Sequence, residues 1–160
     1  MEIKRICNIY FSPTGTTQKV VNAIGDCLAD SFETDRLDYD FTLPKARRSF
    51  PLFGESDLVI FGCPTYAGRL PNLLLKYLDT IAGNGALAIP VVTFGNRAFD
   101  NSLIELQDLL ETHGFHAIAA AAFSCEHSFS DTLGAGRPDD ADLEDAENFA
   151  FAVSGKLIKA

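Results

Sequence analysis

The chain has 160 residues, and 13 Lys and Arg against 22 Asp and Glu give it a formal net charge of −9. With 47% hydrophobic and 22% charged residues, it is typical of a single domain, residues 1–160, that folds unaided around a buried core. This composition excludes a disordered tail or a coiled coil. The negative charge opposes binding to nucleic acid and to anionic membranes, and it favours partner proteins with basic surfaces.

The apolar pattern alternates between strands and helices from the N-terminus onward. Residues 6–11 form a β-rich run, and the helical spacing of the apolar residues from Val20 to Leu28 predicts a helix after it. A weak strand follows over residues 34–37 and a strong, continuously apolar strand over residues 58–61. The segment 38–56 between them contains two prolines and allows one short helix.

In the second half of the chain, a helix is predicted over residues 70–81, with Pro71 in its first turn and glycines after its end. Residues 115–123 are predicted to form one uninterrupted strand, the fifth. The other elements expected here are a strand, a helix, a polar glycine-rich segment and a last helix, at residues 88–94, 103–110, 124–138 and 139–159.

Five strands alternating with helices predict an α/β fold, a three-layer sandwich around a five-stranded parallel sheet, because right-handed crossovers place helices on both faces. In an open parallel sheet, ligands bind beyond the carboxyl ends of the strands, where the strand order reverses. The loops after the first, third and fourth strands are therefore the candidates for a site.

The first of these loops holds four hydroxyl side chains and a glycine ahead of a helix. Gly15 allows backbone N–H groups to turn inward, the hydroxyls can donate to phosphate oxygens, and the helix dipole favours an anion. The alternative is that Ser12 or Thr14 is only a helix cap. The lysine of nucleotide triphosphatase loops and the Gly-x-Gly-x-x-Gly dinucleotide pattern are both missing. The candidate residues here are Ser12, Pro13, Thr14, Gly15, Thr16 and Thr17.

The other two loops are small, polar and stiff, and each carries an aromatic residue, Tyr66 in one and Phe99 in the other. Each aromatic alone is more often ordinary packing, but three such loops at one sheet edge favour a clamp for a flat ring beside the phosphate. The candidate residues are Pro64, Thr65, Tyr66, Ala67, Gly68 and Arg69 in the second loop, and Phe94, Gly95, Asn96, Arg97, Phe99 and Asp100 in the third.

These loops resemble those of the flavodoxin-like FMN-binding family, and the resemblance covers essentially the whole chain. The first loop fits the family's Ser/Thr-x-Thr-Gly-x-Thr phosphate pattern, and the other two resemble its paired isoalloxazine loops. The resemblance implies FMN as cofactor and the strand order 2-1-3-4-5. Residues 64–71, 95–100 and 135–138 look most similar to a branch in which the domain precedes a ferredoxin-type iron-sulfur module, whose cysteine runs are missing from this chain.

The chain departs from typical flavodoxins in having no tryptophan, so Tyr66 and Phe99 are the residues available to stack on the flavin. The net charge of −9 disfavours an anionic reduced flavin. Arg69 and Arg97 could stabilise the anionic flavin if their guanidinium groups lie near it. The alternative, which we favour, is that both side chains point to solvent or to acidic neighbours such as Asp100. The long insertion of long-chain flavodoxins is expected to be missing from the fifth strand.

We therefore expect an FMN-binding electron carrier, favoured as a monomer, that exchanges electrons with redox partner proteins. These are a ferredoxin-type module or a reductase, in trans or in a longer native chain. An FMN-dependent NAD(P)H:quinone-type reductase on the same fold is the alternative, and a phosphate-ester or phosphotransfer module without flavin is a third possibility. We expect a cytoplasmic setting with reduced cysteines, no bound metal and no membrane segment.

Overall fold

The computed structural model describes residues 2–66, 68–95, 101–124 and 140–158. Its middle layer is a sheet whose paired strands are all parallel, in the order β2-β1-β3-β4-β5, with β6 also paired to β4. The predicted sandwich and its strand order are thereby confirmed. The strands are β1 (Arg5–Tyr10), β2 (Asp35–Asp40), β3 (Asp57–Pro64), β4 (Leu87–Phe94), β5 (His116–Ala117) and β6 (Ala121–Ser124).

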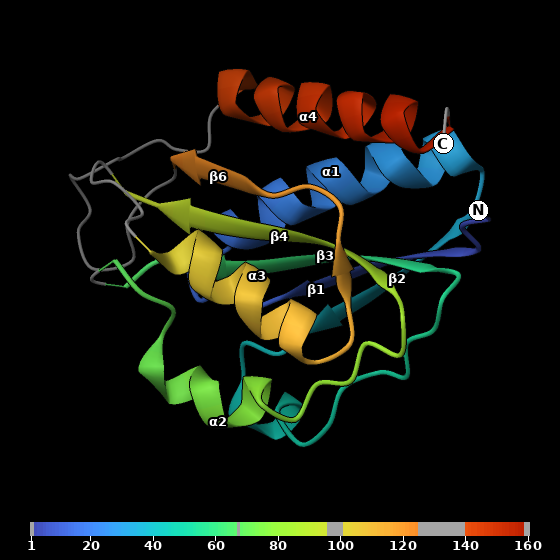
Figure 1. Ribbon diagram of the computed structural model, residues 1–160. Helices are drawn as coiled ribbons and strands as arrows, with labels where there is room; N and C mark the ends of the chain where they lie inside the picture. Colours follow the sequence, from blue (N-terminus) through green and yellow to red (C-terminus); the bar gives the residue numbers. More distant parts are fainter. Residues whose placement is uncertain (1, 67, 96–100, 125–139, 159–160) are drawn as a thin grey trace.

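Helices cover both faces of the sheet (Figure 1). One face carries α1 (Thr16–Phe32) and α4 (Asp140–Ile158), which pack against each other. The apolar residues of α1 that predicted a helix are fully buried against the strands. The other face carries α2 and α3, together with two 3-10 turns. Their bounds are Pro44–Ala46 for η1, Asn72–Leu74 for η2, Leu75–Leu78 for α2 and Ser102–Thr112 for α3.

The segment between β2 and β3 is held to the sheet by aromatic side chains. Phe41 lies fully buried among Phe50, Phe61 and Tyr77, and the rings of Phe50 and Tyr77 stack with centroids 4.1 Å apart. This cluster belongs to the apolar layer under α2 and α3. This aromatic packing holds the segment between β2 and β3 against the sheet, although η1 is its only helical turn within the described residues.

The predicted uninterrupted fifth strand is wrong, because two separate strands, β5 and β6, pair with β4. From Ala117 to Ala121 the chain advances four residues, whereas its partner β4 advances three, from Ala88 to Val91. The extra residue falls opposite Pro90, which has no N–H to offer a neighbouring strand. The Ile118 N–H still donates to the Ala88 carbonyl at 3.0 Å, and the pairing then lapses until it resumes at β6.

The predicted helix over residues 70–81 is also too long. Leu70 and Pro71 precede the helical turns, and Pro71 has extended ψ, 122°. Helical structure is confined to η2 and α2, which together span residues 72–78. The apolar spacing that suggested three turns arises because Leu70, Leu74, Leu78 and Ile81 are all buried on the same side of the chain.

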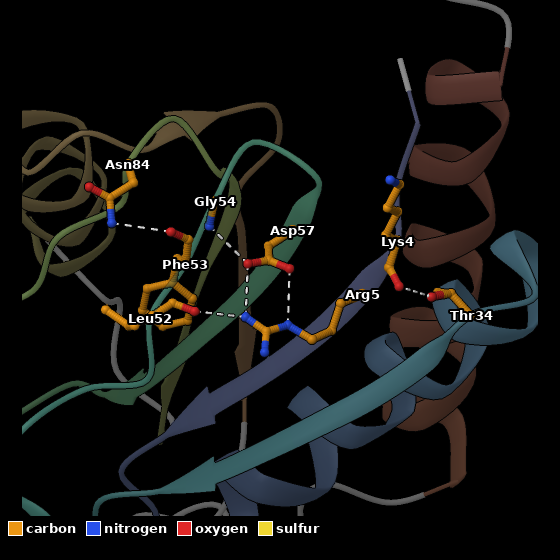
Figure 2. Close-up of polar contacts among 8 residues, drawn as sticks. All are labelled: Lys4, Arg5, Thr34, Leu52, Phe53, Gly54, Asp57 and Asn84. Carbon is orange, nitrogen blue, oxygen red and sulfur yellow. Dashed lines mark hydrogen bonds and ion pairs between the residues drawn. The ribbon is translucent and has the colours of Figure 1, made fainter.

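The amino ends of β1 and β3 are joined by one carboxylate, as Figure 2 shows. Arg5 donates from Nε and Nη2 to the two oxygens of Asp57, at 3.0 and 2.9 Å, and the Gly54 N–H donates to Asp57 at 2.9 Å. The same guanidinium donates to the Leu52 carbonyl at 2.8 Å. Because the Asp57 side chain is only 11% exposed, little water screens these bonds.

Asp57→Asn is expected to lower the free energy of unfolding by about 1.5–3 kcal/mol. Arg5 and the Gly54 N–H donate to two charged carboxylate oxygens in the parent, whereas an asparagine amide offers them a single, neutral acceptor oxygen. Urea unfolding of the parent and the variant measures the difference. The matched control is Asp108→Asn, at an exposed position of α3, which should change the value by less than about 0.5 kcal/mol. Equal losses in both variants would contradict the assigned role of Asp57.

Candidate functional site

Three loops meet in an open cleft at the carboxyl ends of β1, β3 and β4. This is the place where the strand order reverses, between β1 and β3. The structure thus brings together the three loops that the sequence singled out. The lining residues are Pro13, Thr14, Thr16, Thr17, Pro64, Thr65, Tyr66, Thr93, Phe94 and Gly95, of which Thr93 alone was not a predicted site residue.

The first loop turns sharply into α1 at Gly15. The Gly15 N–H donates to the Ser12 carbonyl at 3.2 Å, and Gly15 has φ of +84°, a conformation that glycine adopts at no steric cost. The Ser12 hydroxyl accepts the N–H of Gln18 in the first turn of the helix at 2.9 Å. The Ser12 hydroxyl thus satisfies one N–H of the first helical turn, while Gly15 occupies the N-cap position.

The three threonines of this loop all line the cleft, but their hydroxyls have different partners. The hydroxyls of Thr17 and Thr93 are hydrogen-bonded at 2.8 Å and both residues are buried, so Thr17 joins α1 to β4. The hydroxyls of Thr14 and Thr16 are hydrogen-bonded to each other at 3.1 Å. One hydroxyl of that pair keeps its hydrogen for a third group, because the other already donates between them.

The backbone of this loop supplies further donors. Among the described residues, none accepts a hydrogen bond from the backbone N–H of Thr14, Thr16 or Thr17. The N–H groups of a first helical turn have no partner within their own helix, and they lie at the positive end of its dipole. With the Thr14 and Thr16 hydroxyls, they form a donor set suited to an anion with several oxygens.

The second loop forms a tight turn beside the cleft. The Tyr66 N–H donates to the Arg69 carbonyl at 2.8 Å and the Arg69 N–H donates back at 3.0 Å, with Gly68 at φ +78° between them. The loop is joined to β4 by a hydrogen bond of 2.8 Å from the Thr65 N–H to the Thr93 carbonyl. The half-buried Tyr66 is the aromatic wall of the cleft on this side.

Arg69, a predicted cofactor-binding residue, does not line the cleft. Its guanidinium donates to Glu105 of α3 through Nε at 3.1 Å and Nη2 at 2.6 Å, a two-pronged geometry that matches a carboxylate. The arrangement favoured from the sequence, an acidic neighbour, is the one observed, with Glu105 as the partner. Arg69 and the Leu70 N–H together hold the pKa of the Glu105 carboxyl below its usual range.

Close packing under the cleft determines how near α1 lies to the sheet. A Cβ at Gly62 of β3 would lie 2.4 Å from a methyl of Val21 and 2.9 Å from the methyl of Thr17, so the helix rests directly on the strand backbone. The next residue, Cys63, is fully buried, and burial raises the pKa of its thiol well above the usual range. Cys7, Cys27 and Cys63 are free thiols.

Several predicted site residues fall outside the described residues: Ala67, Asn96, Arg97, Phe99 and Asp100, as well as the polar segment 125–138. Within the described ranges there is no cluster of three or more His, Cys, Asp or Glu side chains placed to hold a metal ion. In the same ranges no helix combines the length and the apolar character needed to cross a membrane.

Sequence reasoning missed Thr93, Ser102 and Glu105, which are hydrogen-bonded to residues of the site loops from β4 and α3.

The strand order, the helical layers and the cleft at the switch point define a flavodoxin-like fold. No family model matches the chain, and no curated protein matches it either. Solved structures do resemble it. Oxidised flavodoxin 1 from Bacillus cereus has 17% sequence identity and a TM-score of 0.68, over 92% of this chain and 95% of that one. A flavodoxin from Streptococcus pneumoniae TIGR4 has 21% identity and a TM-score of 0.63, over 95% and 99%.

A third likeness is to part of a larger protein. Rubredoxin oxygen:oxidoreductase from Desulfovibrio gigas has 16% identity and a TM-score of 0.68, over 99% of this chain but only 37% of that one. The fold thus occurs both as a protein of about this length and as a segment of a longer oxidoreductase. At these identities the likenesses establish the fold.

Proposed function

We propose that the chain is an FMN-binding electron-transfer protein. The observation that carries this proposal is that one cleft joins an anion-binding set of donors to an aromatic wall. FMN has a phosphate at one end and a flat, largely apolar ring at the other, so the donor set suits the phosphate and the aromatic wall suits the ring. FMN supplies the redox chemistry, since it takes up and releases electrons singly or in pairs.

Different residues of the cleft bind the phosphate and the ring of the cofactor. The hydroxyls of Thr14 and Thr16 and the N–H groups of the first turn of α1 bind the phosphate. Tyr66 and Phe94 flank the ring from the second and third loops. Asn96, Arg97, Phe99 and Asp100 are proposed on sequence grounds to complete the ring site. Ser12, Gly15 and Thr17 shape the loop.

Charge adjusts the energetics of reduction. The net charge of −9 disfavours added negative charge on the cofactor, which lowers its potential and makes the reduced protein a stronger electron donor. The Arg69 guanidinium does not offset this effect, because its charge is paired with Glu105. Redox proteins with basic surfaces are the proposed partners, and the likeness to a segment of a longer oxidoreductase supports partners joined in one chain as well as free ones.

The experiment that tests the proposal is an anaerobic visible titration. FMN is added to the purified protein, then NADPH, then a chemical reductant in small steps. We expect tight binding, no reduction by NADPH, and reduction by the chemical agent in two separable one-electron stages. Rapid bleaching by NADPH would instead identify a reductase. Failure to bind FMN would overturn the proposal and leave an anion-binding cleft.

A further inference from the structure

The turn after β3 is anchored to the first turn of α3 by two side chains. The Thr65 hydroxyl is hydrogen-bonded to the Ser102 hydroxyl at 2.8 Å, and both residues are buried. Glu105, three residues further along the same helix, accepts from the Arg69 guanidinium and also from the Leu70 N–H at 2.9 Å. Residues three apart share one face of a helix, so one turn of α3 is hydrogen-bonded to both ends of the loop, at Thr65 and at Arg69 and Leu70.

We propose that Glu105 is a positioning residue of the cofactor site, holding the turn that carries Tyr66 against the cleft through its bonds to Arg69 and Leu70. The inference rests on the proposed function. Glu105 belongs to the helix that the third loop enters, since residues 96–100 connect Gly95 of the cleft to Asn101 and α3.

The burial of the partners indicates which of these bonds matters most. Arg69 is 59% exposed, and an ion pair at such a position contributes little by itself. Leu70 is 1% exposed, so its N–H has no ready substitute in water if the carboxylate is removed. The Glu105 side chain, 19% exposed, also lies at the helix end where negative charge is favoured. The carboxylate is therefore the anchor, and Arg69 reinforces it.

This arrangement makes the sign of a variant's effect informative. If Arg69 acted on the cofactor by its own charge, removing Glu105 would release the guanidinium and strengthen the binding of an anionic ligand. If Glu105 positions the turn, removing its charge loosens the wall of the cleft, and binding weakens because the turn must be ordered again at each binding event.

The test compares Glu105→Gln with Asp108→Asn, an exposed position on the same helix where the change of charge is identical. We expect the Kd for FMN to rise about tenfold in Glu105→Gln and less than twofold in Asp108→Asn. In the full chain, before FMN is added, amide exchange at Leu70 should be about tenfold faster in Glu105→Gln, with exchange in the strands unchanged.

Equal affinities in the two variants, or tighter binding by Glu105→Gln, would overturn the inference while leaving the proposed function intact. A parent chain that fails to bind FMN overturns the proposed function and the inference with it. Should Glu105→Gln fail to fold, Glu105→Asp takes its place, because it keeps the charge but withdraws the carboxylate from Leu70. Weaker binding by this variant supports positioning, and parental affinity refutes it.

Discussion

Thr14→Glu is expected to lower the affinity for FMN by at least 100-fold. Thr14 is exposed and lines the cleft, beside first-turn N–H groups of α1 that have no acceptor among the described residues. A carboxylate there occupies the donors and repels the phosphate, which carries a charge of about −2. At a separation of about 5 Å and an effective dielectric constant of about 40, that repulsion costs on the order of 3 kcal/mol, which corresponds to a factor of about 100.

Quenching of FMN fluorescence measures this loss, and three further measurements make it specific. Thr112→Glu adds the same charge at the far end of α3 and should change the affinity less than threefold. Riboflavin, which lacks the phosphate, should bind Thr14→Glu and the parent about equally. Without ligand, Thr14→Glu should melt at the parental temperature or slightly above it, because a negative charge suits a helix N-terminus. An FMN affinity within threefold of the parent would refute the phosphate site.

Gly25→Ala is expected to lower the free energy of unfolding by about 2–3 kcal/mol. A Cβ at Gly25 would lie 2.1 Å from Oδ1 of Asn8, a fully buried residue of β1. Asn8 cannot swing away freely, because its Nδ2 donates to Asp38 at 3.1 Å. Either the asparagine loses that bond or α1 moves off the sheet, and overpacking of this kind outweighs the helical preference for alanine.

Chemical denaturation of Gly25→Ala and of a matched control, Gly155→Ala in α4, tests this packing argument. No atom of the described residues lies within 4 Å of the added methyl at Gly155, so that variant should gain up to about 1 kcal/mol. Adding Asn8→Ala to Gly25→Ala should recover part of the loss, since it removes both the obstruction and an Oδ1 that has no hydrogen-bond partner within the described structure. Equal behaviour of the two alanine variants would contradict the close contact.

The strand order and the place of the cleft could be predicted from local patterns, and the reasons are physical. β3 and β4 are buried on both faces, so they read as continuous apolar runs. The topology of a parallel sheet then brings the loops after β1, β3 and β4 to one edge. The division of the last strand could not be predicted in this way, because it depends on Pro90 in the neighbouring strand and on one residue of excess length.

The roles of individual site residues were harder to predict than the loops that hold them. A run of four hydroxyls is compatible with a phosphate site, but the partner that turns Thr17 inward, Thr93, lies 76 positions away. The carboxylate that engages Arg69 lies 36 positions away, on a helix whose apolar stripe gives no sign of it. Such pairings arise from tertiary packing, which no local pattern encodes.

The burial of Cys63 has a chemical consequence for the proposed redox site. The thiol lies one residue before Pro64, which forms part of the cleft wall, and is wholly covered by packed side chains. Peroxides and disulfides react with the exposed thiolate, a form that burial disfavours here. Cys63 is thus shielded from oxidation even though it lies next to the wall of the proposed redox site.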